Sequence, residues 1–204
     1  MNIKSITYLL AILVIVLFAS TDQLAWSLVR ASGFVATGLL VTSMVVGIMS
    51  STKAAKQQLH AADLFQIHRT TGYLTLLAIA VHTLGLLADS YINFSLSDVL
   101  IPGISSYRPV AVAVGIVAAY LAIIVTFSFD LKRWLGTRAW RMLHMLNYPL
   151  LAMAIYHGVV AGTDTGSIGA QLFYYGSGFL VLAATIFRVL SPKKQPAFRR
   201  KIPS

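Results

Sequence analysis

Residues 68–82 read HRTTGYLTLLAIAVH, an apolar run with a histidine at each end. In an α-helix these two histidines share one face and differ in depth, with a rise of about 21 Å between them. A second pair, His144 and His157, lies in WRMLHMLNYPLLAMAIYHGVVAGTDT at residues 140–165, with a rise of about 19.5 Å. Ionisable side chains inside apolar helices are costly and usually functional, although any single one could be a packing residue. Two apolar segments therefore offer histidines at nearly the same two depths.

The composition around these segments is that of a membrane protein. Of the 204 residues, 57% are hydrophobic and 11% are charged, whereas about a quarter are charged in soluble domains. Apolar runs without strand-like alternation predict helices, because lipid requires every backbone polar group to be bonded internally. We therefore expect an all-α, polytopic membrane helix bundle forming a single domain over residues 1–204. Its predicted transmembrane helices, about six in number, cover residues 5–19, 26–49, 66–88, 109–129, 141–161 and 169–190.

Charge placement supports this topology and gives its orientation. The net charge is +10, but the basic residues lie in short loops between the spans, which argues against nucleic-acid binding. Successive loops of a membrane bundle lie on opposite sides of the membrane, and on this basis 14 of the 16 basic residues fall on one side. Because basic residues accumulate on the cytoplasmic side, we expect both termini to be cytoplasmic, in a bacterial or archaeal cell membrane. The two basic residues on the other side are Arg30 and Arg108. The first apolar run could instead be a cleaved signal peptide, but Leu17 and Phe18 are too large for the cleavage pattern, so we expect its retention.

The absence of cysteine excludes thiolate-bound metals, iron–sulfur clusters and covalently attached haem. The third and fifth helices run in the same direction, so His68 should meet His144 near the cytoplasmic side, and His82 should meet His157 near the outer side. Facing imidazoles suit the two axial positions of haem iron, whereas zinc would need a tetrahedral cluster at one depth.

The 13-residue spacing between His144 and His157 does not place both rings on the same face of an ideal helix. In an ideal helix it leaves the two histidines about 140° apart around the axis. Pro149 lies between them, and a proline can kink or rewind a helix, so we expect a distortion there that re-aims one ring. The alternative is a proline that merely kinks a membrane helix.

These two segments resemble the ferric reductase-like transmembrane domain over about residues 30–190. That family includes ferric reductases, the membrane core of NADPH oxidases and the haem-binding subunit of a periplasmic methionine-sulfoxide reductase. The resemblance implies two b-type haems with His68, His82, His144 and His157 as axial ligands, and electrons passing from the cytoplasmic haem to the outer one. Members that act alone carry a flavin- and nicotinamide-binding domain after the last helix, and the roughly 14 residues here are too few for one. The expected electron donor is therefore a separate flavin reductase or membrane quinol.

Other residues near the histidines could contact haem or could have a purely structural role. Arg69 and Arg141 could bind propionates of the inner haem and Arg108 those of the outer haem, because arginine offers a forked donor set, or they could be topological anchors. Three glycines close to the histidines could admit a porphyrin or simply allow close helix packing: Gly72, Gly85 and Gly158. We expect His60 to be a loop residue.

The leading hypothesis is a transmembrane oxidoreductase subunit in membrane lipid that reduces ferric iron, oxygen or a partner protein outside the cytoplasm. No motif for hydrolysis or phosphoryl transfer is present, so no side chain is predicted to be catalytic by itself. Two alternatives stay open: a proton or metal transporter using the intramembrane histidines, and a haem sensor without turnover. The few acidic residues lie in loops or at helix ends, which disfavours the transporter.

Overall fold

The computed structural model describes residues 22–90 and 92–191, whose regular structure is entirely helical, so the predicted all-α class is confirmed. The helix predicted at residues 5–19 lies outside this part of the chain. The described helices are α2 (Asp22–Met49), α3 (Lys53–Gln58), α4 (Ala61–Ala88), α5 (Leu96–Leu100), α6 (Pro109–Phe127), α7 (Lys132–Met145), α8 (Asn147–Ala161) and α9 (Ile168–Leu190).

Four of these helices are long and apolar enough to cross a membrane: Leu24–Met49, Ala61–Ala88, Pro109–Phe127 and Ile168–Leu190. A span needs about 20 apolar residues at 1.5 Å per residue. They correspond to four of the predicted spans, and α4 begins five residues earlier than expected. The predicted total of six spans is not established by these helices, because α8 has only 15 residues.

The predicted span at 141–161 is two helices rather than one. α7 begins at Lys132 and ends at Met145, and α8 begins at Asn147. The interruption lies at Leu146, whose N–H bonds to the carbonyl of Leu143 at 3.0 Å in a tight turn. Pro149 occupies the first turn of α8, where a backbone N–H would have no partner within the helix, so its missing N–H costs no hydrogen bond. Its ring would clash with the carbonyl four residues earlier if one helix ran through this point. The distortion expected between His144 and His157 is therefore present.

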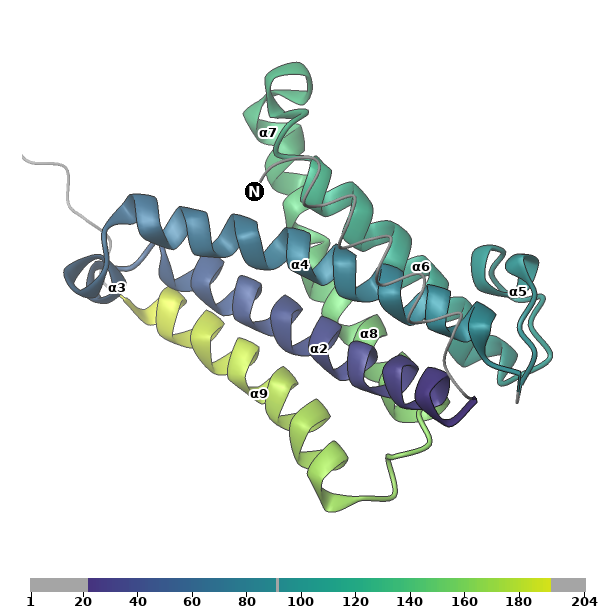
Figure 1. The fold of residues 1–204 in the computed structure, drawn as a ribbon. Helices are drawn as coiled ribbons and strands as arrows, with labels where there is room; N and C mark the ends of the chain where they lie inside the picture. The colour runs from purple at the N-terminus through teal and green to yellow at the C-terminus, as the bar shows by residue number, and fades with distance from the viewer. Residues whose placement is uncertain (1–21, 91, 192–204) are drawn as a thin grey trace, which may run out of the picture.

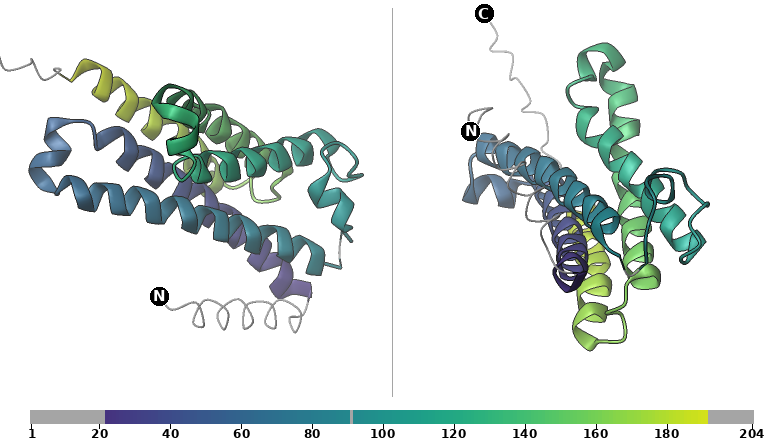
Figure 2. Two further views of the ribbon diagram at one scale, coloured as in Figure 1. Left: turned by 90° about the horizontal axis from the view of Figure 1, so that it is seen from above. Right: turned by 45° about the vertical axis from the view of Figure 1, so that its right-hand side comes forward.

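The bundle consists of two antiparallel pairs, α2 with α4 and α6 with α8, which form its most extensive helix interfaces. α9 packs on α2 and α8, and α7 extends beyond the end of the bundle (Figure 1). The views of Figure 2 show the α7–α8 arm standing beside the α2–α4 pair. The four histidines come from three helices: His68 and His82 from α4, His144 from α7 and His157 from α8. α4 and α8 belong to different pairs.

The main apolar core lies at the middle of the bundle. It contains buried residues from α2, α6, α8 and α9: Leu40, Val41, Met44, Ala118, Ala122, Leu150, Leu151 and Val181. On α8 the core positions Leu150 and Leu151 fall between His144 and His157 in the sequence, and on α2 the positions Leu40 and Val41 fall between Val29 and Ser43. In lipid such packing, rather than the hydrophobic effect, holds helices together.

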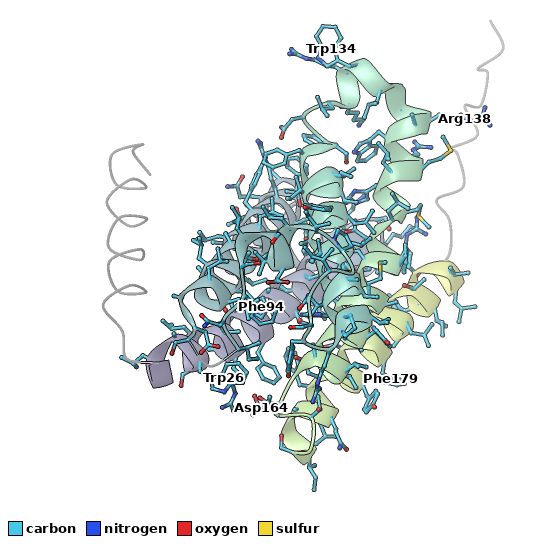
Figure 3. All side chains as sticks on the ribbon, turned by 90° about the vertical axis from the view of Figure 1, so that its right-hand side faces the viewer. Trp26, Phe94, Trp134, Arg138, Asp164 and Phe179 are labelled. Carbon is cyan, nitrogen blue, oxygen red and sulfur yellow. The ribbon has the colours of Figure 1, made fainter. Side chains whose placement is uncertain are left out.

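The two ends of the bundle differ in charge. Trp134 and Arg138 lie on α7 at one end, and Trp26 and Asp164 lie at the opposite end (Figure 3). The first end also carries the basic helix α3, with Lys53 and Lys56. We call it the basic end.

Candidate haem-binding site

The structure brings His68, His82, His144 and His157 together as two pairs. The ring centroids of His82 and His157 are 6.2 Å apart with an interplanar angle of 86°, and those of His68 and His144 are 5.8 Å apart at 76°. The pair formed by His82 and His157 is called the His82 layer below. The pair formed by His68 and His144 is called the His68 layer, and it lies toward the basic end.

The His82 layer faces a cavity of about 210 Å³ between the two helix pairs. α2, α4, α6 and α8 all contribute to its wall, which includes both histidine rings and is otherwise mainly apolar. Ligand sites in helix bundles are commonly apolar spaces of this kind with a few convergent polar groups.

Three of the four histidines make the same bond to a neighbouring helix. In each, Nδ1 lies 2.8 Å from a backbone carbonyl oxygen. His68 bonds to Ser43 and His82 to Val29, both on α2, while His157 bonds to Ala111 on α6. A carbonyl only accepts, so Nδ1 must carry the proton. That tautomer leaves the lone pair on Nε2, the nitrogen available to a metal, and a carbonyl bonded to the other nitrogen is the usual support of a metal-binding histidine.

His144 is the exception. Its Nδ1 is buried and has no hydrogen-bond partner among the described residues. Its ring instead stacks on Trp140, one turn earlier on α7, with centroids 5.4 Å apart and planes inclined by 26°. The ammonium of Lys132 also lies over the Trp140 ring, 4.4 Å from its centroid.

This arrangement fits a flat macrocycle held between two imidazoles. An imidazole nitrogen binds a transition metal at about 2.0 Å, so two bonds in line, together with the ring radii, put the ring centres about 6 Å apart. Both observed separations match that value. Within residues 22–90 and 92–191, no group of three or more metal-ligating side chains occurs, so the donors come in pairs rather than in a tetrahedral cluster.

The arginines predicted to accompany the haems have other contacts. The guanidinium of Arg69 is 3.7 Å from Asp130 and lies over the ring of Tyr73, whose hydroxyl donates to Asp130 at 3.1 Å. Arg108 donates to the carbonyls of Val160 and Gly162 at the end of α8. Arg141 is exposed on α7, one turn before His144.

Sequence reasoning missed the arginine that lines the cavity. Arg30 of α2 forms a forked ion pair with Asp164, which lies in the loop between α8 and α9, and its Nε is 2.6 Å from Oδ2. Both residues line the wall of the cavity at the His82 layer. The sequence signal was present, since Arg30 is one of only two basic residues predicted on the outer side.

The glycines that touch the histidines are also not those predicted. A Cβ built at Gly85 would meet Val29, one at Gly158 would meet the ring of Tyr174, and one at Gly72 would have ordinary contacts. Gly85 and Gly158 therefore allow close helix packing, and Gly158 also lines the cavity at the His82 layer. The glycines beside histidine rings lie on the neighbouring helices: Gly33, Gly47 and Gly115. Gly33 and Gly47 repeat the 14-residue spacing of His68 and His82, which was the signal that could have identified them.

Comparison with known proteins identifies the family of this chain. Searches among curated proteins and among solved structures give no significant match. The family described as "Ferric reductase like transmembrane component" matches residues 32–155, more than half of the chain. The matched region includes α4 with both of its histidines, α6 and His144. The chain therefore belongs to the ferric reductase-like transmembrane family, whose members form transmembrane oxidoreductase cores.

Proposed function

We propose that this chain is the electron-transfer subunit of a transmembrane oxidoreductase and holds two b-type haems, one in each histidine layer. The observation that carries the proposal is the pair of facing imidazoles at each of two depths, with centroids 5.8 and 6.2 Å apart. When bound, two such haems supply one-electron carriers at two depths of the membrane.

The side chains then have separate tasks. His68 and His144 bind one iron, and His82 and His157 bind the other. The carbonyls of Ser43, Val29 and Ala111 fix the tautomer and the direction of three rings. The apolar core between the layers excludes water, which holds the local dielectric constant low.

The direction of transfer follows from the charges. The basic end is proposed to face the cytoplasm under the positive-inside rule, so electrons enter at the His68 layer and leave at the His82 layer. The donor is proposed to be a separate flavin reductase or quinol. The acceptor is ferric iron, oxygen or a partner protein on the outer side.

Anionic propionates need cationic partners. At the His82 layer we propose Arg30, which lines the cavity and also pairs with Asp164, ahead of Arg108, whose contacts are with carbonyls at the end of α8. At the His68 layer we propose Arg141, which is exposed one turn from His144, ahead of Arg69, which is engaged by Tyr73 and Asp130.

Spectroscopy of the purified chain tests the proposal. After expression with sufficient haem, the dithionite-reduced spectrum should show six-coordinate b-type haem at two equivalents per chain. Nearly perpendicular axial imidazole planes leave two iron d orbitals close in energy, so the ferric form should give strongly anisotropic low-spin EPR signals. A spectrum without haem bands would refute the proposal and favour the transporter alternative.

A further inference from the structure

The three supported histidines share a second feature besides the carbonyl bond. Each accepting carbonyl is followed four residues later by a glycine: Val29 by Gly33, Ser43 by Gly47, and Ala111 by Gly115. In an α-helix the N–H of residue i+4 points at the carbonyl of residue i. A ring bonded to that carbonyl therefore lies against residue i+4, and a glycine there makes room for it.

The space available differs between the three positions. A Cβ built at Gly115 would lie 2.6 Å from Cε1 of His157, which no real contact allows. At Gly47 the distance to Cε1 of His68 would be 3.0 Å, and at Gly33 the distance to Cε1 of His82 would be 3.4 Å. The need for glycine thus falls from Gly115 to Gly47 to Gly33.

α6 ends too early to give His144 the same support. On α2 the two accepting carbonyls are 14 residues apart, as are His68 and His82 on the antiparallel α4. The same step along α6 leads from Ala111 to Val125, whose carbonyl accepts the hydroxyl of Ser128 at 2.7 Å. The position four residues further is Phe129, beyond the end of α6 at Phe127 and occupied by a large side chain.

We propose that His144 is the exchangeable ligand of the four and that the His68 layer therefore binds small neutral ligands, such as carbon monoxide or imidazole, in its place. This inference rests on the proposed function. In the exchange one bond to iron breaks at Nε2 of His144 and one forms to the added ligand, with no change in electron count.

The expected size of the effect follows from the missing bond. Removing the hydrogen-bonded partner of a metal-binding histidine typically weakens metal binding about 10- to 100-fold. The stacking of Trp140 restrains the ring of His144 but gives its Nδ1 no partner. We therefore expect external ligands to bind at the His68 layer about 10- to 100-fold more tightly than at the His82 layer.

The test is a titration of the full-length, haem-loaded chain with carbon monoxide in the reduced state and imidazole in the oxidised state, followed by difference spectra. The wild type should bind the ligand at one of its two haems. A His82→Ala/His157→Ala double variant, which leaves only the His68 layer, should still bind it, and a His68→Ala/His144→Ala variant should not. Double variants are used so that each protein keeps only one layer, with both of its histidines.

A second set of variants is designed to change ligand binding at the His82 layer without replacing any of the four histidines. Gly115→Ala should displace His157 from the Ala111 carbonyl and make the His82 layer bind carbon monoxide as well. Gly33→Ala should do so much less. The matched control is Gly176→Ala on α9, where a new Cβ meets nothing within 4 Å and should leave both layers unchanged.

The outcomes separate the two proposals. Equal ligand binding at both layers, no binding at either, or binding confined to the His82 layer would overturn the inference while leaving the haem assignment intact. Gly115→Ala behaving like Gly176→Ala would also overturn it. Failure of the chain to bind haem would instead overturn the proposed function.

Discussion

The His82 layer and the His68 layer use the same side chains but differ in what holds those side chains in place. The His82 layer lies among the interiors of four helices, and both of its rings are bonded to carbonyls of α2 and α6. The His68 layer lies where α6 has ended, so one ring is bonded to α2 and the other rests on Trp140. The two layers therefore differ in how many of their rings a neighbouring helix holds: both rings in the His82 layer and one in the His68 layer.

The two layers also differ in what surrounds them. The cavity at the His82 layer is lined by the ion pair of Arg30 and Asp164, which joins α2 to the loop before α9. The His68 layer borders α7, which projects from the bundle with Trp134 77% exposed (Figure 1). The His82 layer faces a cavity among four helices, and the His68 layer lies beside the exposed helix α7.

The largest expected effect tests whether the two layers exist as separate sites. Replacing His68 or His144 by alanine should remove the haem of one layer, and replacing His82 or His157 should remove that of the other, so each variant loses about half of the bound haem. Haem-to-protein ratios and reduced spectra of the four variants would show this. His60→Ala, at the exposed start of α4, is the control and should keep both haems. Losses that pair His68 with His82 would contradict the layers.

The second prediction concerns the exposed side of the His68 layer. If the donor is a soluble acidic reductase, reversing Lys53, Arg133 and Arg138 to glutamate should slow haem reduction about 10-fold at low salt, because charge steering raises association rates by 10-fold or more. The wild-type rate should itself fall between 0.1 M and 1 M salt, as the Debye length shrinks from about 10 Å to about 3 Å.

Stopped-flow reduction in inside-out vesicles measures this rate. Arg133→Lys/Arg138→Lys keeps the charge and serves as the control. A quinol donor, which arrives through lipid, should show neither effect. Salt-independent reduction by a confirmed soluble donor would mean that these residues only set topology.

The third prediction sharpens the difference in packing. Gly158→Ala would drive a Cβ into the ring of Tyr174, 2.6 Å from its hydroxyl oxygen, beside His157. We expect a loss of stability of about 1–3 kcal/mol from overpacking, with the haem of the His82 layer released first on heating. Thermal unfolding in detergent, followed at the haem bands, measures it. Equal behaviour of Gly158→Ala and Gly176→Ala would show that α8 and α9 shift at little cost.

The smallest expected effect concerns the ion pair that lines the cavity at the His82 layer. The side chains of Arg30 and Asp164 are 43% and 25% exposed, so their coupling should be only about 0.2–1 kcal/mol and should weaken with salt. A double-mutant cycle with Arg30→Gln and Asp164→Asn measures it through thermal stability. A larger coupling that persists at high salt would indicate a pair shielded from solvent.

Much of the fold could be predicted from local signals. Apolar length predicted α2, α4, α6 and α9, because lipid leaves the backbone no alternative to helix. The break between α7 and α8 was partly predictable from the 13-residue spacing and Pro149, but its position at Leu146 was not. The start of α7 at Lys132 was missed, because its polar composition does not resemble a membrane span.

The sequence by itself determined the all-helical membrane class, the two depths of the histidines and the basic character of one end, because each depends only on composition and on the rise of a helix. Only the tertiary structure decided which carbonyl holds which ring, that Gly33, Gly47 and Gly115 rather than Gly72, Gly85 and Gly158 lie against the histidines, and that Arg30 rather than Arg108 lines the cavity. These features depend on how antiparallel helices are aligned along each other. The same holds for His144, whose Nδ1 has no carbonyl partner among the described residues: spacing along one helix predicts the depth of a ligand, but the neighbouring helix decides how its ring is held.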